Sequence, residues 1–194
     1  ERAPGDRAVN RRPTANKTIL VISQVYVPDA ASVGQHMHDA AAELARRGNR
    51  VVVLTSARGY DDPTVRYPAR ETRDGVEVVR LPLYSFGKKT ILLRLLGQML
   101  FLLQCVLRGW TMRGLSCIVV STSPPMASVA ALGIRLLRRV KIKFWVMDLN
   151  PDQVVALGKA KAGSLPVRMF DWLNRRILAA AYDVIVLDRY MAQR

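Results

Sequence analysis

The alternation of short apolar runs with longer helical segments is the strongest constraint on the fold of this chain. Runs rich in β-branched residues occupy 18–25, 50–56, 75–82, 116–123, 141–148 and 182–188. Segments of helix-forming composition lie at 32–47, 89–113, 126–139 and 164–181. Nearly continuous apolar strands separated by helices are typical of a parallel sheet covered on both faces. The sequence therefore predicts the α/β class, with a doubly wound parallel sheet and right-handed crossovers.

The chain is predicted to consist of a short leader and one domain. Residues 1–17 contain Arg and Pro but no apolar stretch, so they are not a signal peptide and we expect a disordered basic leader. Residues 18–194 have the size and apolar content of one α/β domain. The chain stops at Arg194 shortly after a strand-like run, which favours a fragment of a longer protein.

Few residues are suited to metal binding or to nucleophilic catalysis. The cysteines are Cys105 and Cys117, both in apolar surroundings, and the histidines are His36 and His38. Because no CxxC pair is present, these residues have neither the spacing of a zinc site nor obvious material for a Ser-His-Asp or Cys-His triad. The cysteines are typical of buried, reduced thiols in a cytosolic protein. We therefore expect no zinc site in this chain.

The net charge of +15 is large for a chain of this size and is unevenly distributed. No Asp or Glu occurs from Val78 to Met147, although Lys and Arg are frequent there. Such an excess indicates an anionic partner: nucleic acid, a phosphorylated substrate or the acidic headgroups of a membrane. A basic proteome or an acidic partner domain is the alternative explanation. Nucleic acid is disfavoured because no recognition motif for it is present.

The segment 90–110 combines an apolar centre with a basic fringe. From Leu95 to Leu107 it carries no charge, but this stretch is too short to span a bilayer. Such a helix suits the bilayer interface, with its cations directed to anionic lipid. An ordinary crossover helix buried against the sheet is the competing interpretation. The residues predicted to contact a membrane are Lys88, Lys89, Arg94 and Arg108.

In an open parallel sheet, ligands bind in the crevice beyond the carboxyl ends of the strands. The loop after the first strand leads into a helix near Ser32, whose first N–H groups would favour a phosphate. Gly34 is the only glycine of this segment, so the Gly-rich sequence of a dinucleotide site is absent. A plain helix capped by Ser32 and stopped at Gly48 is the alternative.

The run at 116–123 ends in the hydroxyl residues Ser121, Thr122 and Ser123. Hydroxyl groups in the crevice could hold sugar or phosphate oxygens. They could equally cap the helix that begins at the two prolines that follow. Both interpretations stay open, since one residue can serve both roles.

The run at 141–148 ends in the sequence DLNPD, residues 148–152. Turn formation explains Asn150, Pro151 and Asp152 well, but it explains Asp148 less well. Asp148 still belongs to the predicted strand, and both Asp148 and Asp152 would project into the crevice. A carboxylate there can orient a hydroxyl group or accept its proton. Asp148 is therefore the preferred catalytic candidate.

These segments together resemble the N-terminal domain of family 4 glycosyltransferases. The resemblance runs from about Thr18 to the C-terminus and is closest to members that build bacterial surface polysaccharides, which carry a Y-x-P-P-D loop, a TSPP element and a D-L-W-P-D segment. The matching stretches, in chain order, are VISQVYVPDAASVGQHMHDAAAELARRGNRVVVLTS, GVEVVRLP, STSPP, WVMDLNPDQVVALG and YDVIVLD.

The resemblance implies a GT-B enzyme, in which two Rossmann-like domains face each other across a cleft. It implies retaining transfer of a sugar, hexosyltransferase-like, from a nucleotide sugar as co-substrate and without a required metal. The N-terminal domain of such enzymes mainly receives the acceptor, and the C-terminal domain binds the nucleotide. This chain would then be the acceptor side, inactive without its own C-terminal domain. Its acceptor would be lipid-linked or a polysaccharide, at the cytoplasmic face of the membrane.

The resemblance also implies roles for individual residues. Asp148 stands where the family has an acidic or histidine residue beside the transferred sugar. The residues that would approach the donor diphosphate are Ser32, Gly34 and Gln35. The residues that would line the acceptor side of the cleft are Ser121, Thr122, Ser123, Asn150 and Asp152. The alternative function is a non-catalytic α/β module that binds a nucleotide or phosphate.

Overall fold

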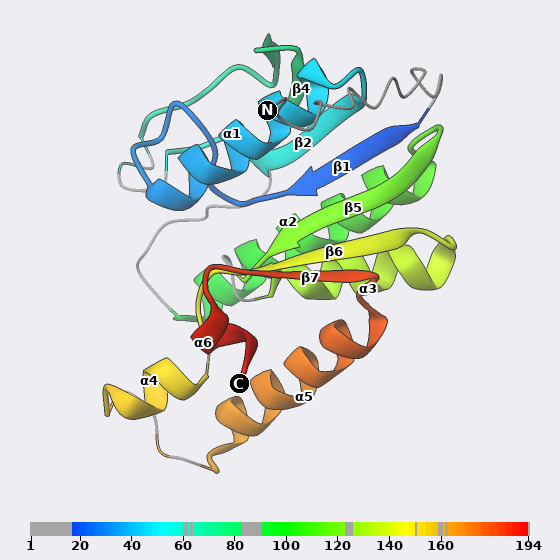
Figure 1. Cartoon of the computed structure of the whole chain (residues 1–194). Coiled ribbons are helices and arrows are strands. Elements are labelled where there is room, and N and C mark those ends of the chain that lie inside the picture. The colour runs from blue at the N-terminus through cyan, green and yellow to red at the C-terminus, as the bar shows by residue number, and fades with distance from the viewer. Residues whose placement is uncertain are drawn as a thin grey trace, which may run out of the picture.

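The computed structural model describes residues 17–59, 62, 64–82, 91–122, 126–149, 151–158, 161 and 163–193. Within these residues the chain forms one sheet of seven strands with helices on both faces (Figure 1). The strands are β1 Thr18–Ile22, β2 Arg50–Ser56, β3 Arg70–Arg73, β4 Val76–Leu81, β5 Leu115–Ser121, β6 Lys141–Val146 and β7 Asp183–Val186. The helices are α1 Ser32–Arg46, α2 Ile91–Thr111, α3 Ala127–Leu137, α4 Asp152–Ala156, α5 Leu165–Ala180 and α6 Arg189–Ala192.

The sheet has the strand order β3-β4-β2-β1-β5-β6-β7, and every neighbouring pair except β3 and β4 is parallel. The chain moves outward from β1 to one side through β2 and β4, then returns to build the other side from β5. This arrangement is Rossmann-like and confirms the predicted fold class. Apart from Lys17, the predicted leader lies outside the described residues.

One strand was not predicted. β3 lies inside the polar stretch 56–75, which has no apolar alternation in its sequence. It is a sheet edge with no buried residue, and it pairs with β4 through a turn at Asp74 and Gly75. Both turn residues have positive φ, as a two-residue hairpin requires, so the Asp-Gly pair was the available signal.

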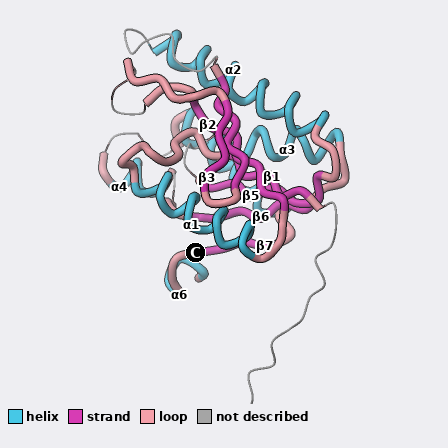
Figure 2. Tube along the Cα trace, turned by 90° about the horizontal axis from the view of Figure 1, so that it is seen from above, coloured by secondary structure: helices cyan, strands magenta, loops and turns pink. Residues whose placement is uncertain are grey.

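The two faces of the sheet are covered by different helices. Figure 2 shows α1 on one side of the strands and α2 with α3 on the other. Met37 and Ala41 of α1 pack on one face, and Phe101, Ile134 and Ile177 of α2, α3 and α5 pack on the other. Alternate residues of each strand therefore enter two separate cores.

α2 agrees in part with both interpretations of its sequence. Phe101, Leu102 and Cys105 are buried against the sheet, as in an ordinary crossover helix, whereas Leu103 and Trp110 are about half exposed. Within the described part of the chain, no helix is long and apolar enough to cross a membrane. Cys105 is buried and Cys117 is half-buried, and neither forms a disulfide. Burial raises the pKa of the Cys105 thiol.

The contact between α2 and α3 depends on Gly109. A Cβ atom at this buried position would lie 2.8 Å from Cγ1 of Ile134. At Gly133 of α3, the nearest atom to an added Cβ would be Cγ2 of Val106, at 3.1 Å. The two glycines thus differ in the space that an alanine would find.

We predict that Gly109→Ala lowers the free energy of unfolding relative to Gly133→Ala by about 1–3 kcal/mol, the usual cost of overpacking a core. Both substitutions gain about 1 kcal/mol of helix propensity, so the comparison isolates the steric effect. Urea unfolding of the two variants measures the difference. Equal stabilities would show that α2 and α3 are not packed this closely.

Candidate functional site

The carboxyl ends of β5 and β6 are joined through Thr122. Its hydroxyl oxygen accepts hydrogen bonds from the backbone N–H groups of Met147 and Asp148, at 3.0 Å each. Its own N–H donates to the carbonyl of Trp145 at 3.1 Å. Thr122 is buried, so these contacts fix the direction in which the chain leaves β6. The Asp148 backbone is held at the strand end by this hydroxyl.

Asp148 lies beside two neighbouring cavities. The first, of about 390 Å³, is lined by residues of β6, β7, α5 and α6 and is open on one side. The second, of about 470 Å³, includes Asp188 and Tyr190. Asp148 and Asp152 line both. The polar residues of the first cavity are Thr122, Asp148, Asp152, Asp171 and Asn174.

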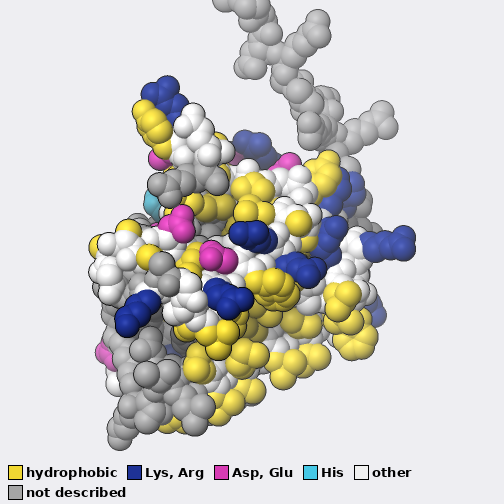
Figure 3. Space-filling model, turned by 90° about the horizontal axis from the view of Figure 1, so that it is seen from below, with side chains coloured by type: hydrophobic (Ala, Val, Ile, Leu, Met, Phe, Trp, Pro, Cys, Tyr) yellow, Lys and Arg dark blue, Asp and Glu magenta, His cyan; other side chains and the backbone are white. Residues whose placement is uncertain are grey.

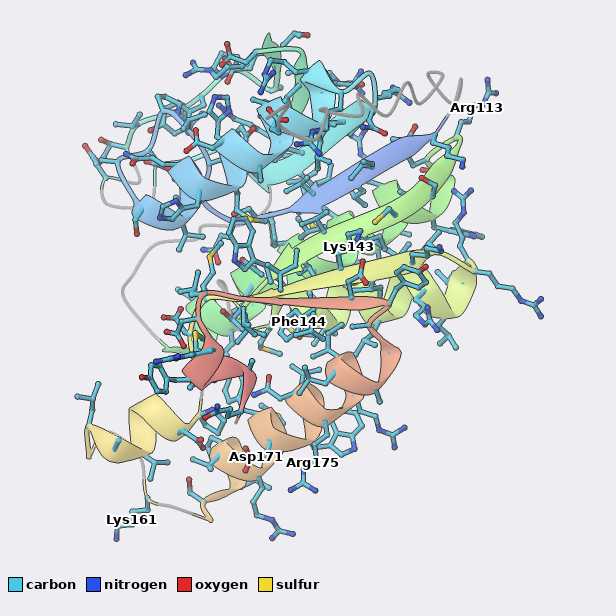
Figure 4. All side chains as sticks on the ribbon, in the orientation of Figure 1. Arg113, Lys143, Phe144, Lys161, Asp171 and Arg175 are labelled. Carbon is cyan, nitrogen blue, oxygen red and sulfur yellow. The ribbon has the colours of Figure 1, made fainter. Side chains whose placement is uncertain are left out.

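The first cavity is lined by both apolar and polar side chains. Phe144 and Val146 of β6 face α5, which contributes Asp171, Asn174 and Leu178. Figure 4 labels Phe144 on β6 and Asp171 on α5. Because carboxylates and an amide stand beside an apolar surface, the cavity can bind a molecule that has both hydroxyl groups and an apolar face.

The structure brings together part of the predicted site. Thr122, Asp148 and Asp152 share one cavity, and Ser121 is buried at the end of β5. Ser32, Gly34 and Gln35 do not line either of these two cavities. The predicted site residues Ser123 and Asn150, and the predicted membrane contacts Lys88 and Lys89, lie outside the described residues, as does the side chain of Arg94.

Two polar residues of the first cavity were not predicted as site residues. Asp171 and Asn174 are three residues apart on α5, so they share one face of that helix. The spacing was visible in the sequence, but only the packing of α5 on β6 shows that this face meets Asp148. Across the described residues, no group of three or more His, Cys, Asp or Glu side chains could hold a metal ion.

The start of α1 differs from the predicted capped helix. Ser32 is the first helical residue rather than the cap, and Ala31 in the N-cap position makes no side-chain hydrogen bond. The prediction of a Ser32 cap is therefore wrong. The first turn of the helix contains no acidic residue. The backbone N–H groups of this first turn point out of the N-terminal end of α1, at the carboxyl edge of the sheet. An anion would be favoured at that end.

Gly34 has a structural explanation that needs no ligand. It is buried, and a Cβ atom there would lie 3.2 Å from Cα of Tyr26. The glycine allows α1 to pack directly on the backbone of the loop after β1. Ser32 and Gln35 are exposed on the same turn of the helix.

A buried arginine holds the loop after β1. Arg80 of β4 is 3% exposed, and its Nη2 donates to the carbonyl of Val27 at 3.0 Å and to Oε1 of Glu71 at 2.5 Å. Its guanidinium lies 4.8 Å from the centre of the Tyr67 ring, and Tyr67 donates its hydroxyl hydrogen to Asp29 at 3.0 Å. The peptide bond between Val27 and Pro28 is cis.

Burial dominates the electrostatics of this cluster. Loss of hydration lowers the pKa of Arg80, and the negative charge of Glu71 acts in the opposite direction. Burial raises the pKa of Tyr67, and its hydrogen bond to Asp29 raises it further. Arg80 Nε is buried with no hydrogen-bond partner among the described residues. The signal in the sequence was an arginine between the apolar residues Val79 and Leu81 near the end of a strand.

A second polar chain ties the same loop to α1 and to the β3–β4 turn. The hydroxyl of Tyr26 lies 3.0 Å from Nδ1 of His38, and Nε2 of His38 lies 3.0 Å from Asp74. Burial raises the pKa of Tyr26, so its hydroxyl keeps its proton. The geometry fits a Tyr26 hydroxyl that donates to Nδ1 of His38, while the Nε2–H of His38 donates to the carboxylate of Asp74.

The described residues form a Rossmann-like domain with a cavity, partly lined by polar residues, at the carboxyl ends of its strands. Residues 32–194 match the sequence model of the glycosyltransferase 4-like domain. The chain belongs to this family, and the predicted resemblance to family 4 glycosyltransferases is confirmed at that level. A comparison with curated proteins finds no match.

The Arg80 cluster leads to a prediction about stability. Arg80→Met should lower the free energy of unfolding by about 3 kcal/mol, because it leaves Glu71 without its buried partner. The double variant Arg80→Met with Glu71→Gln should recover part of this loss, since the side chain that has lost Arg80 then carries no charge.

The matched control is the exposed pair of Arg50 and Glu77, whose atoms Nη2 and Oε2 are 2.8 Å apart. Arg50→Met should cost at most about 1 kcal/mol. Urea unfolding compares the variants. If the loss of unfolding free energy in the double variant equals the sum of the losses in Arg80→Met and in Glu71→Gln alone, Arg80 and Glu71 are not coupled.

Proposed function

We propose that this chain is the acceptor-side domain of a retaining glycosyltransferase of the type that builds bacterial surface polysaccharides. The observation that carries the proposal is the position of Asp148. It follows β6, whose last residue is Val146, rather than belonging to the strand as predicted, and it lies beside two cavities in a domain of the glycosyltransferase 4-like family. In such a crevice a carboxylate meets the substrate rather than the core.

In the proposed reaction, an acceptor hydroxyl oxygen bonds to the anomeric carbon of a hexose as the bond from that carbon to the nucleoside diphosphate breaks. The diphosphate takes the electron pair and the hydroxyl proton. Asp148 lies beside the transferred sugar and accepts a hydrogen bond from it. The acceptor contacts Asp152, Asn150 and the hydroxyl residues at the end of β5, which are Ser121, Thr122 and Ser123.

The donor contacts in this proposal come from two sources. The N-terminus of α1, with Ser32, Gly34 and Gln35, approaches the donor diphosphate, since free N–H groups and the helix dipole stabilise an anion. The nucleotide itself is bound by a second α/β domain across the cleft. The chain alone is then inactive, and no metal is required for the transfer.

The proposed setting is the cytoplasmic face of a membrane, with a lipid-linked or polysaccharide acceptor. The support is the charge distribution, with no acidic residue from Val78 to Met147. Lys88, Lys89, Arg94 and Arg108 are the basic residues assigned to the lipid surface from the sequence.

A non-catalytic module that binds a nucleotide or phosphate is the second candidate. The observation that favours it is the start of α1, which makes no side-chain capping hydrogen bond. The loop before α1 has no glycine-rich sequence, which argues against a complete nucleotide site in this chain.

The role of Asp148 is tested in an enzyme that includes the second domain. Asp148→Asn should lower the rate of sugar transfer by about 100-fold or more, the range for loss of a group acting at the reacting centre. A panel of UDP- and GDP-linked hexoses with a lipid extract as acceptor identifies the donor, and release of nucleoside diphosphate gives the rate. Asp39→Asn, an exposed carboxylate on α1, is the control. Normal transfer by Asp148→Asn would remove this residue from the mechanism.

The two candidate functions differ in what this chain binds alone. If the nucleotide site lies in a second domain, calorimetric titration of residues 1–194 with UDP and with GDP should show no tight binding. A nucleotide-binding module should instead bind tightly, and Gly34→Ala should weaken that binding by displacing α1 from Tyr26. Tight binding by the unmodified chain would favour the second candidate.

A further inference from the structure

Three helices on one side of the sheet expose apolar side chains. On α2, Leu96, Met99, Leu103, Leu107 and Trp110 follow each other at intervals of three or four residues and are each about half exposed. This spacing keeps them on one side of the helix, opposite the buried residues of α2. A packed domain does not need this apolar stripe, because a crossover helix is stabilised by its inner side alone.

The stripe continues on the two neighbouring helices. Leu136 and Leu137 end α3, and Leu136 is 88% exposed. On α5, Leu165, Met169 and Trp172 again follow at intervals of four and three residues and are exposed. Figure 3 shows hydrophobic side chains gathered over one face of the molecule, with Lys and Arg beside them. We call the outer surface of α2, α3 and α5 the three-helix face.

The charges of the three-helix face are mainly basic. Arg176 lies against Trp172, with its guanidinium 5.3 Å from the ring centre. Arg138 joins α3 to the end of α2, donating from Nη1 to the carbonyl of Trp110 at 3.0 Å. α2 and α3 contain no acidic residue, and the acid of α5, Asp171, lines the cavity. Exposed arginines on or beside these helices are Arg108, Arg113, Arg135, Arg139, Arg168 and Arg175.

The charge decides between the possible occupants of this face. A second copy of the chain would bring two sets of arginines together with few carboxylates between them, which opposes association. An anionic bilayer offers phosphate groups for the arginines and acyl chains for the leucines and tryptophans. A face that combines apolar stripes with a basic fringe has the composition of an interfacial membrane surface.

We propose that the three-helix face lies on an anionic phospholipid bilayer, with its apolar side chains about 5–10 Å into the boundary between headgroups and acyl chains. The contact extends beyond α2 to α5. One side of α5 lines the cavity with Asp171 and Asn174, and another side carries Trp172. This extension rests on the proposed function: α5 brings the cavity beside Asp148 next to the lipid surface, so the acceptor is lipid-linked rather than a free glycan.

The test is sedimentation of the whole chain with vesicles of phosphatidylcholine, with and without phosphatidylglycerol, at low salt. The chain should bind the anionic vesicles. Leu103→Ser with Trp110→Ser on α2, and Leu165→Ser with Trp172→Ser on α5, should each reduce the partition coefficient by at least about tenfold. Leu157→Ser, an apolar residue 62% exposed beyond α4, is the matched control and should bind normally.

A second comparison separates a specific face from general attraction by a cationic protein. Arg139→Gln with Arg176→Gln should lower the partition coefficient by about fivefold for each arginine. Arg46→Gln with Arg47→Gln removes the same charge at the end of α1, on the other face of the sheet, and should have little effect. Circular dichroism checks that every variant is folded.

Several results would overturn the proposal. These are absence of binding to anionic vesicles, equal loss of binding in the two arginine pairs, or loss on α2 with none on α5. A concentration-dependent dimer abolished by the same serine substitutions, without lipid binding, would assign the face to a second copy. Vesicle binding needs no sugar transfer. Failure here with Asp148-dependent transfer intact would therefore reject the docking face and the proposed membrane setting, and would leave the proposed transfer reaction standing.

Discussion

The burial of β1 determines where polar chemistry can occur in this domain. Leu20, Val21 and Ile22 are at most 1% exposed, because β2 and β5 pair with the two edges of β1 and helices cover both faces. A strand in this position excludes charged side chains, since an unpaired charge there would lose its hydration. The reversal of strand order beside β1 opens a crevice at the carboxyl edge, and Thr122 and Asp148 lie at the ends of strands on that edge.

The helices and strands that were predicted from the sequence are those with long apolar segments, because such segments indicate burial. All six predicted strands and all four predicted helices are present, with ends that differ by one or a few residues. β3, α4 and α6 were not predicted, because they are short and depend on contacts with neighbouring residues and strands. β3 depends on pairing with β4. α6 depends on Asp188, which accepts hydrogen bonds from the N–H groups of Tyr190 and Met191.

The site was predictable only where it follows directly from strand ends. Asp148 and Asp152 could be placed at the carboxyl edge because a parallel sheet aligns those ends. The contribution of α5 could not be predicted, because Asp171 and Asn174 line the cavity only through tertiary packing. The same holds for Arg80, whose partners Val27 and Glu71 are brought to it by the loop and by β3. Gly34 is the opposite case: its sequence position favoured a phosphate contact, and its burial against Tyr26 explains it without one.

α5 couples the candidate site to the outer surface of the molecule. Its buried side, with Leu173 and Ile177, fixes the helix, so the side that lines the cavity and the side that carries Trp172 cannot move independently. A rigid helix in this position transmits the orientation of the outer surface to the cavity wall. If the three-helix face lies on a bilayer, the cavity has a fixed height above the lipid. An acceptor held in the same bilayer would then meet Asp148 without a search in three dimensions, which reduces the entropy lost on binding.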